Sequence, residues 1–232
     1  PGPDIEEHID ALIAAAGERR ITQIVVTHSH RDHLPGAIRL RERTGATLAG
    51  WATIPEVDRP LSDGETVAVD GVSLRACFTP GHAVDHLSYL LEQEAGLFTG
   101  DMVLGYGSVV VAPPGGDMTD YLASLSRLQS LGSRRIYPGH GPAVDDPAAK
   151  LAEYQAHRQE REQQVLAGLA AGDTTEQDLV RRNYVGLDER LVRWAGLSMR
   201  AHLIKLEREG RVRGEGEGEE RRWYLVSGGT HA

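Results

Sequence analysis

The sequence predicts an α/β layered fold in residues 1–147, followed by a smaller, mainly helical domain in residues 148–232. Two observations predict the layered part. β-Branched segments alternate with segments of helical periodicity over residues 5–51, and two hairpin patterns follow between residues 66 and 99. A third observation predicts the helical part, because the chain then changes to long charged helices that end in a hairpin around "GEGEGEE" (214–220).

The first elements follow from apolar spacing and from glycine stops. Residues 5–17 carry apolar side chains at helical spacing and close at Gly17, which predicts a helix. The β-branched run over 21–27 predicts a strand. A helix over 35–44 and a strand over 46–51 complete a β-α-β order, which is typical of layered α/β folds.

Two hairpins are predicted next. In residues 66–78 the apolar side chains alternate on both sides of Asp70-Gly71, a strong two-residue turn signal. The second hairpin covers residues 87–99 and is predicted to turn through Glu94–Gly96. Alternation on both sides of each turn indicates strands with one buried face.

The rest of the chain is predicted as one more helix–strand step and then a helical module. The step is a helix over 119–131 and a strand over 134–138. A long charged helix starts at residue 148, a capping box "TTEQ" at Thr174 opens a second helix, and a third covers 198–209. Three helices and a hairpin in this order resemble a winged-helix module, with the glycine–glutamate tip as the wing.

Composition limits the possible partners and the compartment. The net charge of −9 lies almost wholly in residues 1–150, so tight, sequence-independent binding to nucleic acid is not expected. The single cysteine, Cys77, is expected to be a buried small hydrophobe and fits a reducing cytoplasm. No apolar run approaches the length of a membrane helix and no signal peptide opens the chain, so a cytoplasmic protein without membrane contact is expected.

Metal-ligand residue types are concentrated directly after the first strand. The stretch "VVTHSHRDHLPGA" (25–37) contains His28, His30, Asp32 and His33 within six positions. Imidazole and carboxylate are common ligands of divalent metals. The stretch therefore predicts part of a metal site.

Three later motifs supply further ligands. "TPGHAVDH" (79–86) contains His82, "FTGDMV" (98–103) contains Asp101, and "YPGHGP" (137–142) contains His140. Each candidate follows a strand-like stretch and a glycine, which lets the backbone turn sharply and direct the next side chain towards a common centre. His86 either supports the ligands or packs structurally.

The candidates divide into two sets of ligands. The first metal could take His28, His30 and His82. The second could take Asp32, His33 and His140, and Asp101 could span both. Two cations about 3.5–4 Å apart can hold a bridging water and lower its pKa. Four other histidines, His8, His157, His202 and His231, are interpreted as packing or surface residues.

The four motifs "THSHRDH", "TPGHAVDH", "FTGDMVLG" and "YPGHGP", in this order, resemble the metallo-β-lactamase superfamily of binuclear hydrolases. The resemblance to its β-lactamase-like protein 2 branch continues through "YLASLSRL", "EYQAHRQEREQQVL" and "LIKLEREGRV" into the winged-helix tail. It implies an αββα sandwich and the same seven metal ligands.

Members normally begin with strands that precede the "PGP" segment, and the sequence starts at that segment. The β-lactamases proper carry a cysteine in the second metal site, where this sequence has Asp101, so antibiotic hydrolysis is not expected.

The resemblance implies a hydrolase with two Zn²⁺ ions, or Mn²⁺ or iron, in which a metal-bridging hydroxide attacks the substrate. Asp32 is expected to ligate the second metal and to orient the water or accept its proton. The expected substrate is a small-molecule thioester or ester. The alternatives are a single-strand endoribonuclease and a non-catalytic binding protein, and a homodimer is possible.

Two further sets of residues bear on the substrate. The glycine- and proline-rich loop over 104–118 is either an ordinary connector or part of the pocket, with Tyr106 as a candidate lining residue. RNA binding would require basic groups in the tail, for which the candidates are Arg181, Arg182, Arg221 and Arg222.

Overall fold

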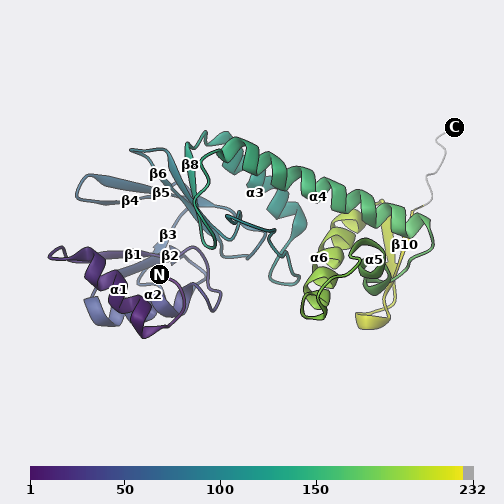
Figure 1. Ribbon diagram of the computed structural model, residues 1–232, viewed down its shortest axis with the longest axis horizontal. Coiled ribbons are helices and arrows are strands. Elements are labelled where there is room, and N and C mark those ends of the chain that lie inside the picture. The colour runs from purple at the N-terminus through teal and green to yellow at the C-terminus, as the bar shows by residue number, and fades with distance from the viewer. Residues whose placement is uncertain (227–232) are drawn as a thin grey trace.

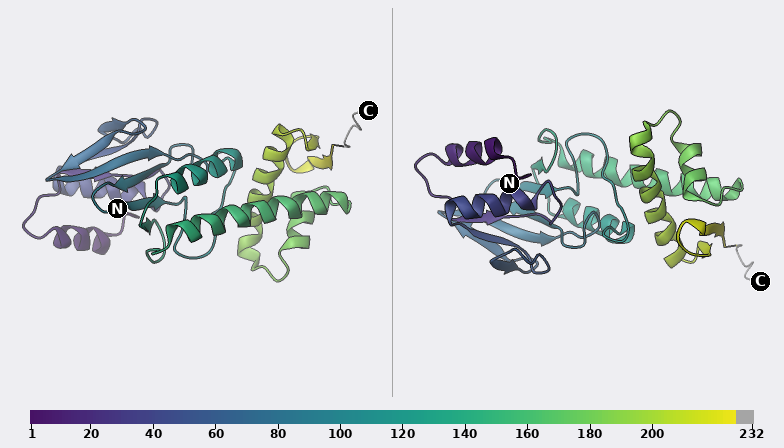
Figure 2. Two further views of the ribbon diagram at one scale, coloured as in Figure 1. Left: turned by 90° about the horizontal axis from the view of Figure 1, so that it is seen from above. Right: turned by 90° about the horizontal axis from the view of Figure 1, so that it is seen from below.

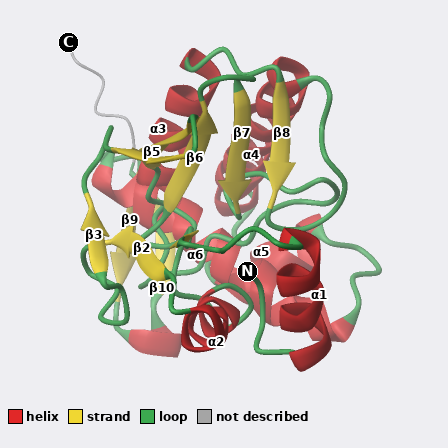
Figure 3. Ribbon diagram, turned by 90° about the vertical axis from the view of Figure 1, so that its left-hand side faces the viewer, coloured by secondary structure: helices red, strands yellow, loops and turns green. Residues whose placement is uncertain are grey.

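The computed structural model describes residues 1–226 as two lobes connected by the long helix α4 (Pro147–Ala170) (Figure 1). The first lobe contains two sheets that face each other (Figure 3). The smaller sheet is parallel and consists of β1 (Gln23–Val25), β2 (Thr47–Trp51) and β3 (Arg59–Leu61). Helices α1 (Glu6–Ala16) and α2 (Leu34–Thr44) cover its outer face.

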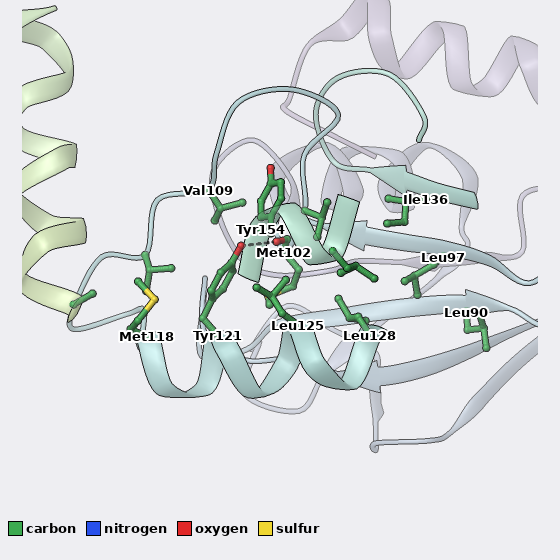
Figure 4. Close-up of a cluster of buried hydrophobic side chains, with 14 residues drawn as sticks. Leu90, Leu97, Met102, Val109, Met118, Tyr121, Leu125, Leu128, Ile136 and Tyr154 are labelled. Atoms are coloured by element: carbon green, nitrogen blue, oxygen red, sulfur yellow. Dashed lines mark hydrogen bonds between the residues drawn. The ribbon is translucent and has the colours of Figure 1, made fainter. Parts of the chain in front are cut away.

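The larger sheet has the strand order β4-β5-β6-β7-β8. Its strands are β4 (Thr66–Val69), β5 (Val72–Phe78), β6 (Leu87–Leu91), β7 (Gly96–Gly100) and β8 (Arg135–Pro138). Neighbouring strands are antiparallel from β4 to β7, whereas β7 and β8 are parallel because α3 (Met118–Ser130) crosses over between them. Helix α3 packs on the outer face of this sheet through Leu125 and Leu128 (Figure 4). The lobe is therefore the αββα sandwich that the sequence predicts.

Apolar contacts hold the layers together. Ala49 and Leu61 of the small sheet share a buried cluster with Ala76, Leu87 and Tyr89 of the large sheet. Each fully buried aliphatic side chain contributes roughly 1.5–3 kcal/mol relative to an exposed one. The expected burial of Cys77 is confirmed, since its side chain is fully buried and free.

Several local predictions are confirmed. The turn at Asp70-Gly71 has positive φ at both residues, +50° and +81°, as a two-residue hairpin turn requires. Gly45 ends α2 with a φ of +70° and donates its N–H to the carbonyl of Arg41. The sequence correctly indicates these positions because the turn and the helix end depend on local backbone conformation.

The second lobe consists of helices and a hairpin. Helix α4 extends into it from the first lobe, and α6 lies across α4 (Figure 2). The elements after α4 are α5 (Glu176–Asn183), α6 (Glu189–Arg208), β9 (Val212–Glu215), the short 3₁₀ turn Gly218–Glu220 and β10 (Arg222–Leu225). Trp223 on β10 is fully buried in a cluster with side chains of all three helices. This arrangement is the expected winged-helix module.

Four details of the prediction were wrong. The capping box of α5 is formed by Thr175 and Asp178, one residue beyond Thr174. Helix α6 begins at Glu189, nine residues before Ser198, because Asp188 caps it. The turn between β6 and β7 ends at Ala95, so Gly96 is already a strand residue. Strand β3 was not predicted, because its three residues carry too little alternation to indicate a strand.

Within residues 1–226, no helix is long and apolar enough to cross a membrane. His231 lies outside the residues that the structure describes.

Candidate metal centre

The seven candidate ligands lie in four loops that meet at one edge of the sandwich. His28, His30 and Asp32 lie between β1 and α2, and His33 occupies the position before α2. His82 lies between β5 and β6, Asp101 directly follows β7, and His140 follows β8 after Gly139. Because β7 and β8 are parallel neighbours with Gly100 opposite Pro138, Asp101 and His140 leave the sheet side by side.

Hydrogen bonds between the two sheets bring the first loop to the others. The N–H of Leu87 on β6 donates to the carbonyl of Thr27 at 2.7 Å. The hydroxyl of Tyr89 donates to the carbonyl of Val26 at 2.7 Å. The residues directly before His28 are therefore bonded to the large sheet, and the first loop lies against the loop of His82.

His28, His30 and His82 form one cluster. Nδ1 of His30 lies 3.0 Å from Nε2 of His28 and 3.0 Å from Nε2 of His82. The other ring nitrogen of His82 donates to the carbonyl of Val110 at 2.9 Å, which leaves its Nε2 as a lone pair directed into the cluster. Burial lowers the pKa of His28 and of His82, so both rings are in the neutral form that binds a metal.

The second cluster combines two carboxylates and two imidazoles. Nε2 of His140 lies 3.0 Å from Oδ2 of Asp32, and Nε2 of His33 lies 3.3 Å from Oδ1 of Asp101. Nε2 of His33 and Oδ1 of Asp101 are buried without a hydrogen-bond partner. Burial by itself raises the pKa of Asp101, but the neighbouring histidines outweigh this effect and lower the pKa, so the carboxylate is ionised.

Asp101 also faces the first cluster. Its Oδ2 lies 3.6 Å from Nε2 of His140 and 3.7 Å from Nε2 of His82. Within each cluster the possible ligand atoms lie within 4.8 Å of one another. A buried imidazole nitrogen and a buried carboxylate oxygen without hydrogen-bond partners, as at His33 and Asp101, are unfavourable unless a cation lies between them. The two clusters therefore indicate a metal site, and their residues fit a pair of divalent cations.

Two glycines next to the ligands cannot carry a side chain. Gly100 has a φ of +48°, and a Cβ there would lie 2.6 Å from Nε2 of His86. A Cβ at Gly139 would lie 2.5 Å from Oδ1 of Asp101 and 2.9 Å from Cε1 of His33. Gly100 is required by its backbone conformation, whereas Gly139 is required because the ligands approach its backbone closely.

The structure also identifies residues around the ligands that the sequence pattern missed. Oδ2 of the buried Asp85 accepts a hydrogen bond from the N–H of Ser29, between His28 and His30. The only available signal was its position among the histidines of "GHAVDH". The carbonyl of Val110 had no signal at all, because any residue supplies a backbone oxygen.

The other histidines take no part in either cluster within residues 1–226. His8 is exposed and contacts the carbonyl of Pro1. His157 is half-buried on α4 beside Arg161, and His202 is buried on α6. These positions agree with packing or surface roles for the three residues.

Comparison with known proteins supports the same family. The sequence model of the metallo-beta-lactamase superfamily matches residues 50–140, and that of the beta-lactamase associated winged helix domain matches residues 175–223. The chain is 35% identical over 197 residues to the beta-lactamase-like protein 2 homolog of Caenorhabditis elegans, covering 78% of this chain and 64% of the relative. It is 32% identical over 235 residues to an atrochrysone carboxyl ACP thioesterase of Aspergillus fumigatus, covering 94% of this chain and 73% of the relative.

A solved structure has the same architecture over nearly the whole chain. A metallo-beta-lactamase family protein from Thermus thermophilus superimposes with a TM-score of 0.78 at 26% identity, covering 97% of this chain and 87% of the other. The order of the elements, the two ligand clusters and these similarities agree with one another. The chain belongs to the metallo-beta-lactamase superfamily and joins that fold to a winged-helix region.

Proposed function

We propose that the protein hydrolyses an acyl thioester with two metal ions, most simply zinc, held by the two clusters. The observation that carries this proposal is the meeting of seven ligand side chains from four loops around one centre. His28, His30 and His82 would hold one ion; Asp32, His33 and His140 would hold the other, with Asp101 between them. A pair of divalent cations would supply Lewis-acid chemistry there by lowering the pKa of water and polarising a carbonyl oxygen.

Asp32 is the residue to which we assign proton transfer. Its side chain is 49% exposed, the most exposed of the carboxylates and imidazoles in its cluster, and its Oδ2 lies 3.0 Å from Nε2 of His140. A carboxylate that both faces the cluster and reaches solvent can accept a proton from the attacking water and release it. Its buried counterpart Asp101 lacks this access and would serve only to hold the ions.

Apolar groups at the rim of the site favour an acyl substrate. Val84, between His82 and His86, is 61% exposed, and Tyr106 is 64% exposed. The Tyr106 ring lies against Gly141, the residue after His140, where a Cβ would come within 2.6 Å of the ring. Exposed apolar side chains beside polar ligands are typical of sites that bind apolar molecules. The ACP thioesterase among the relatives acts on a substrate of this class, as its name states.

The tail offers little support for RNA as the substrate. Arg181 and Arg182 pair with Asp178 and Asp173 on the same module. Arg221 pairs with both oxygens of Glu207 at 2.7 and 2.8 Å. These carboxylates offset the positive charge that a phosphate backbone would otherwise meet on the module.

The test is a panel of substrates offered to the metal-loaded protein at equal concentrations. It contains acyl pantetheine and acyl carrier protein thioesters, S-lactoylglutathione and single-stranded RNA. Turnover of an acyl thioester is expected. Cleavage of RNA without thioester turnover would overturn the proposal in favour of an endoribonuclease, and bound metal without any turnover would favour a binding protein.

Asp32→Asn provides the matched variant. It is expected to reduce kcat by about 100-fold or more, since general acid–base groups contribute that much. Asp120→Asn, an exposed aspartate on α3, is the control and should retain full activity. The metal content of both variants must be measured, because loss of a ligand also reduces kcat.

A further inference from the structure

The 104–117 loop, between Asp101 and α3, contacts two of the ligand loops. The N–H of Gly105 donates to the carbonyl of His140 at 2.8 Å. The carbonyl of Val110 accepts from Nδ1 of His82 at 2.9 Å, and the N–H of Asp117 donates to the carbonyl of Gly81 at 2.8 Å. The conformation of this loop therefore determines where His82 lies and which of its nitrogens carries the proton.

Helix α4 holds this loop from its outer side through residues one turn apart. The hydroxyl of Tyr154 accepts from the N–H of Leu104 at 3.0 Å and donates to the carbonyl of Gly107 at 3.1 Å. Nη2 of Arg158 donates to the carbonyl of Val109 at 2.7 Å. The Val109 carbonyl that Arg158 holds and the Val110 carbonyl that accepts from His82 belong to adjacent peptide units, so the contact of Arg158 fixes the backbone directly before the acceptor of His82.

The environment of Arg158 is unusual for a guanidinium. The side chain is only 3% exposed, and its Cζ lies 5.3 Å from the centre of the Tyr121 ring. Its Nε has no hydrogen-bond partner among the residues that the structure describes, and the Tyr121 side chain is a further hydrogen-bond partner of its guanidinium. Burying a charge is costly unless it is well bonded, and here the Val109 carbonyl accepts a hydrogen bond from the guanidinium at 2.7 Å. Packing alone does not account for an arginine at this position.

Tyr121 supports the same region from α3. Its hydroxyl donates to the carbonyl of Met102, the residue after Asp101, at 2.7 Å (Figure 4). The aromatic face that stabilises the Arg158 guanidinium thus belongs to a residue that also fixes the Asp101 loop. Arg158 therefore contacts both the 104–117 loop, through the Val109 carbonyl, and Tyr121 on α3.

Helix α6 of the winged-helix region also contacts the surroundings of Arg158 and the 104–117 loop. Ala201 belongs to the buried cluster of the first lobe, and the pKa of the buried His202 beside it is lowered by burial and then by the nearby charge of Arg158. At the end of the loop, Arg208 pairs with Asp117, which also caps α3. The second lobe thus contacts the loop that positions His82.

We infer that Arg158 is a positioning residue for the metal ligand His82, acting through the Val109–Val110 peptide, and that it links the winged-helix region to the metal centre. This inference uses the proposed function only in treating His82 as a ligand. It predicts that the metal dissociation constant depends on a side chain of α4 that contacts neither ligand cluster.

The test compares Arg158→Met, which keeps the unbranched apolar stem and removes the guanidinium, with Arg158→Lys, which keeps the charge and an N–H donor group. Arg161→Met is the matched control, because Arg161 lies on the same helix, bonds to Gln164 and stacks on Tyr184. The measurements are Co²⁺ absorption spectra and competition with a chromogenic chelator. Neither measurement requires a substrate.

Arg158→Met is expected to weaken binding of one of two metal equivalents by about 10–100-fold and to change the Co²⁺ spectrum, as loss of support for a ligand does. Arg158→Lys should fall between this variant and wild type, and Arg161→Met should match wild type. A wild-type spectrum and affinity in Arg158→Met, or an equal loss in Arg161→Met, would overturn the inference. If Arg158→Met does not fold, an unchanged Arg158→Lys overturns it.

Failure of the proposed function would look different. A protein that binds two metal ions in the Arg158-dependent way but hydrolyses no thioester contradicts the proposed reaction and leaves this inference standing. A protein with full thioesterase activity whose metal binding does not depend on Arg158 supports the proposed reaction and contradicts this inference.

Discussion

Nε2 of His86 accepts a hydrogen bond from the backbone N–H of Asp101 at 3.2 Å. Nδ1 of His86 must then carry the proton, and it donates to Oγ1 of Thr79 at 3.0 Å. Thr79 in turn bonds to Ser88 at 2.9 Å. The His86 ring is fully buried and directs neither nitrogen to a ligand cluster. Of the two interpretations that the sequence allowed for His86, the structure favours support of the ligands.

His86→Leu should therefore weaken metal binding without removing a ligand. We expect the dissociation constant of the more weakly bound equivalent to rise by about 10–100-fold, because the backbone of Asp101 loses its acceptor. Chelator competition measures the constant. His157→Leu, a half-buried histidine on α4, is the control. Equal affinity in His86→Leu and wild type would show that His86 only fills space.

The close approach at Gly139 predicts a second effect. Gly139→Ala places a methyl group 2.5 Å from Oδ1 of Asp101, so the ligands must move apart. Metal content after dialysis should fall below two equivalents per chain. Gly115→Ala is the control, since its Cβ would meet nothing within 4 Å. A Gly139→Ala protein that retains both equivalents would contradict the geometry of the second cluster.

His202 predicts how stability depends on pH. Burial and then the charge of Arg158 lower the pKa of His202 to about 3 from an ordinary 6.5. Arg158, His157 and Glu162 of α4 and Lys205 of α6 are the charged or titratable groups nearest to it. Between these two pKa values the unfolded chain binds a proton that the folded chain does not, so His202 lowers stability as pH falls.

His202→Leu removes this contribution. From pH 6.5 downwards, the free energy of unfolding of wild type should fall faster than that of the variant, by at most about 1.4 kcal/mol per pH unit. Above pH 7.5 the difference between the two should be constant. Urea unfolding at a series of pH values measures it, and parallel curves down to pH 4 would refute the prediction.

The cap of α5 gives a prediction about folding alone. Oγ1 of Thr175 accepts from the N–H of Asp178 at 3.0 Å, and Oδ2 of Asp178 accepts from the N–H of Thr175 at 3.2 Å. Thr175→Ala should cost about 1 kcal/mol of stability. Thr174→Ala should cost little, because no capping hydrogen bond involves its hydroxyl. The opposite order in thermal unfolding would restore Thr174 as the cap.

The residues of the two His/Asp clusters could be predicted from the sequence because their signal is local. His28, Asp101 and His140 each follow a strand, and chain direction alone places strand ends at a common edge. The hairpin at Asp70-Gly71 was predictable for a similar reason, since positive φ at both residues restricts the residue types that fit.

The supports of the ligands could not be predicted because they depend on tertiary contacts. The acceptor for His82 is a backbone oxygen of Val110, which no residue type marks. Arg158 has the appearance of one more charge on a charged helix, and only the packing of α4 against the 104–117 loop buries it. The start of α6 was missed because its first two turns expose Leu191 and Trp194. These exposed apolar residues obscure the helical period.

We propose that seven side chains distant in the sequence surround a pair of cations. The most direct measurement is a crystal structure of the metal-reconstituted protein, with anomalous scattering recorded at the absorption edge of the metal. We expect two anomalous peaks per chain, one among His28, His30 and His82 and one among Asp32, His33 and His140, with Asp101 touching both. A single peak, or peaks outside these clusters, would contradict a two-cation site.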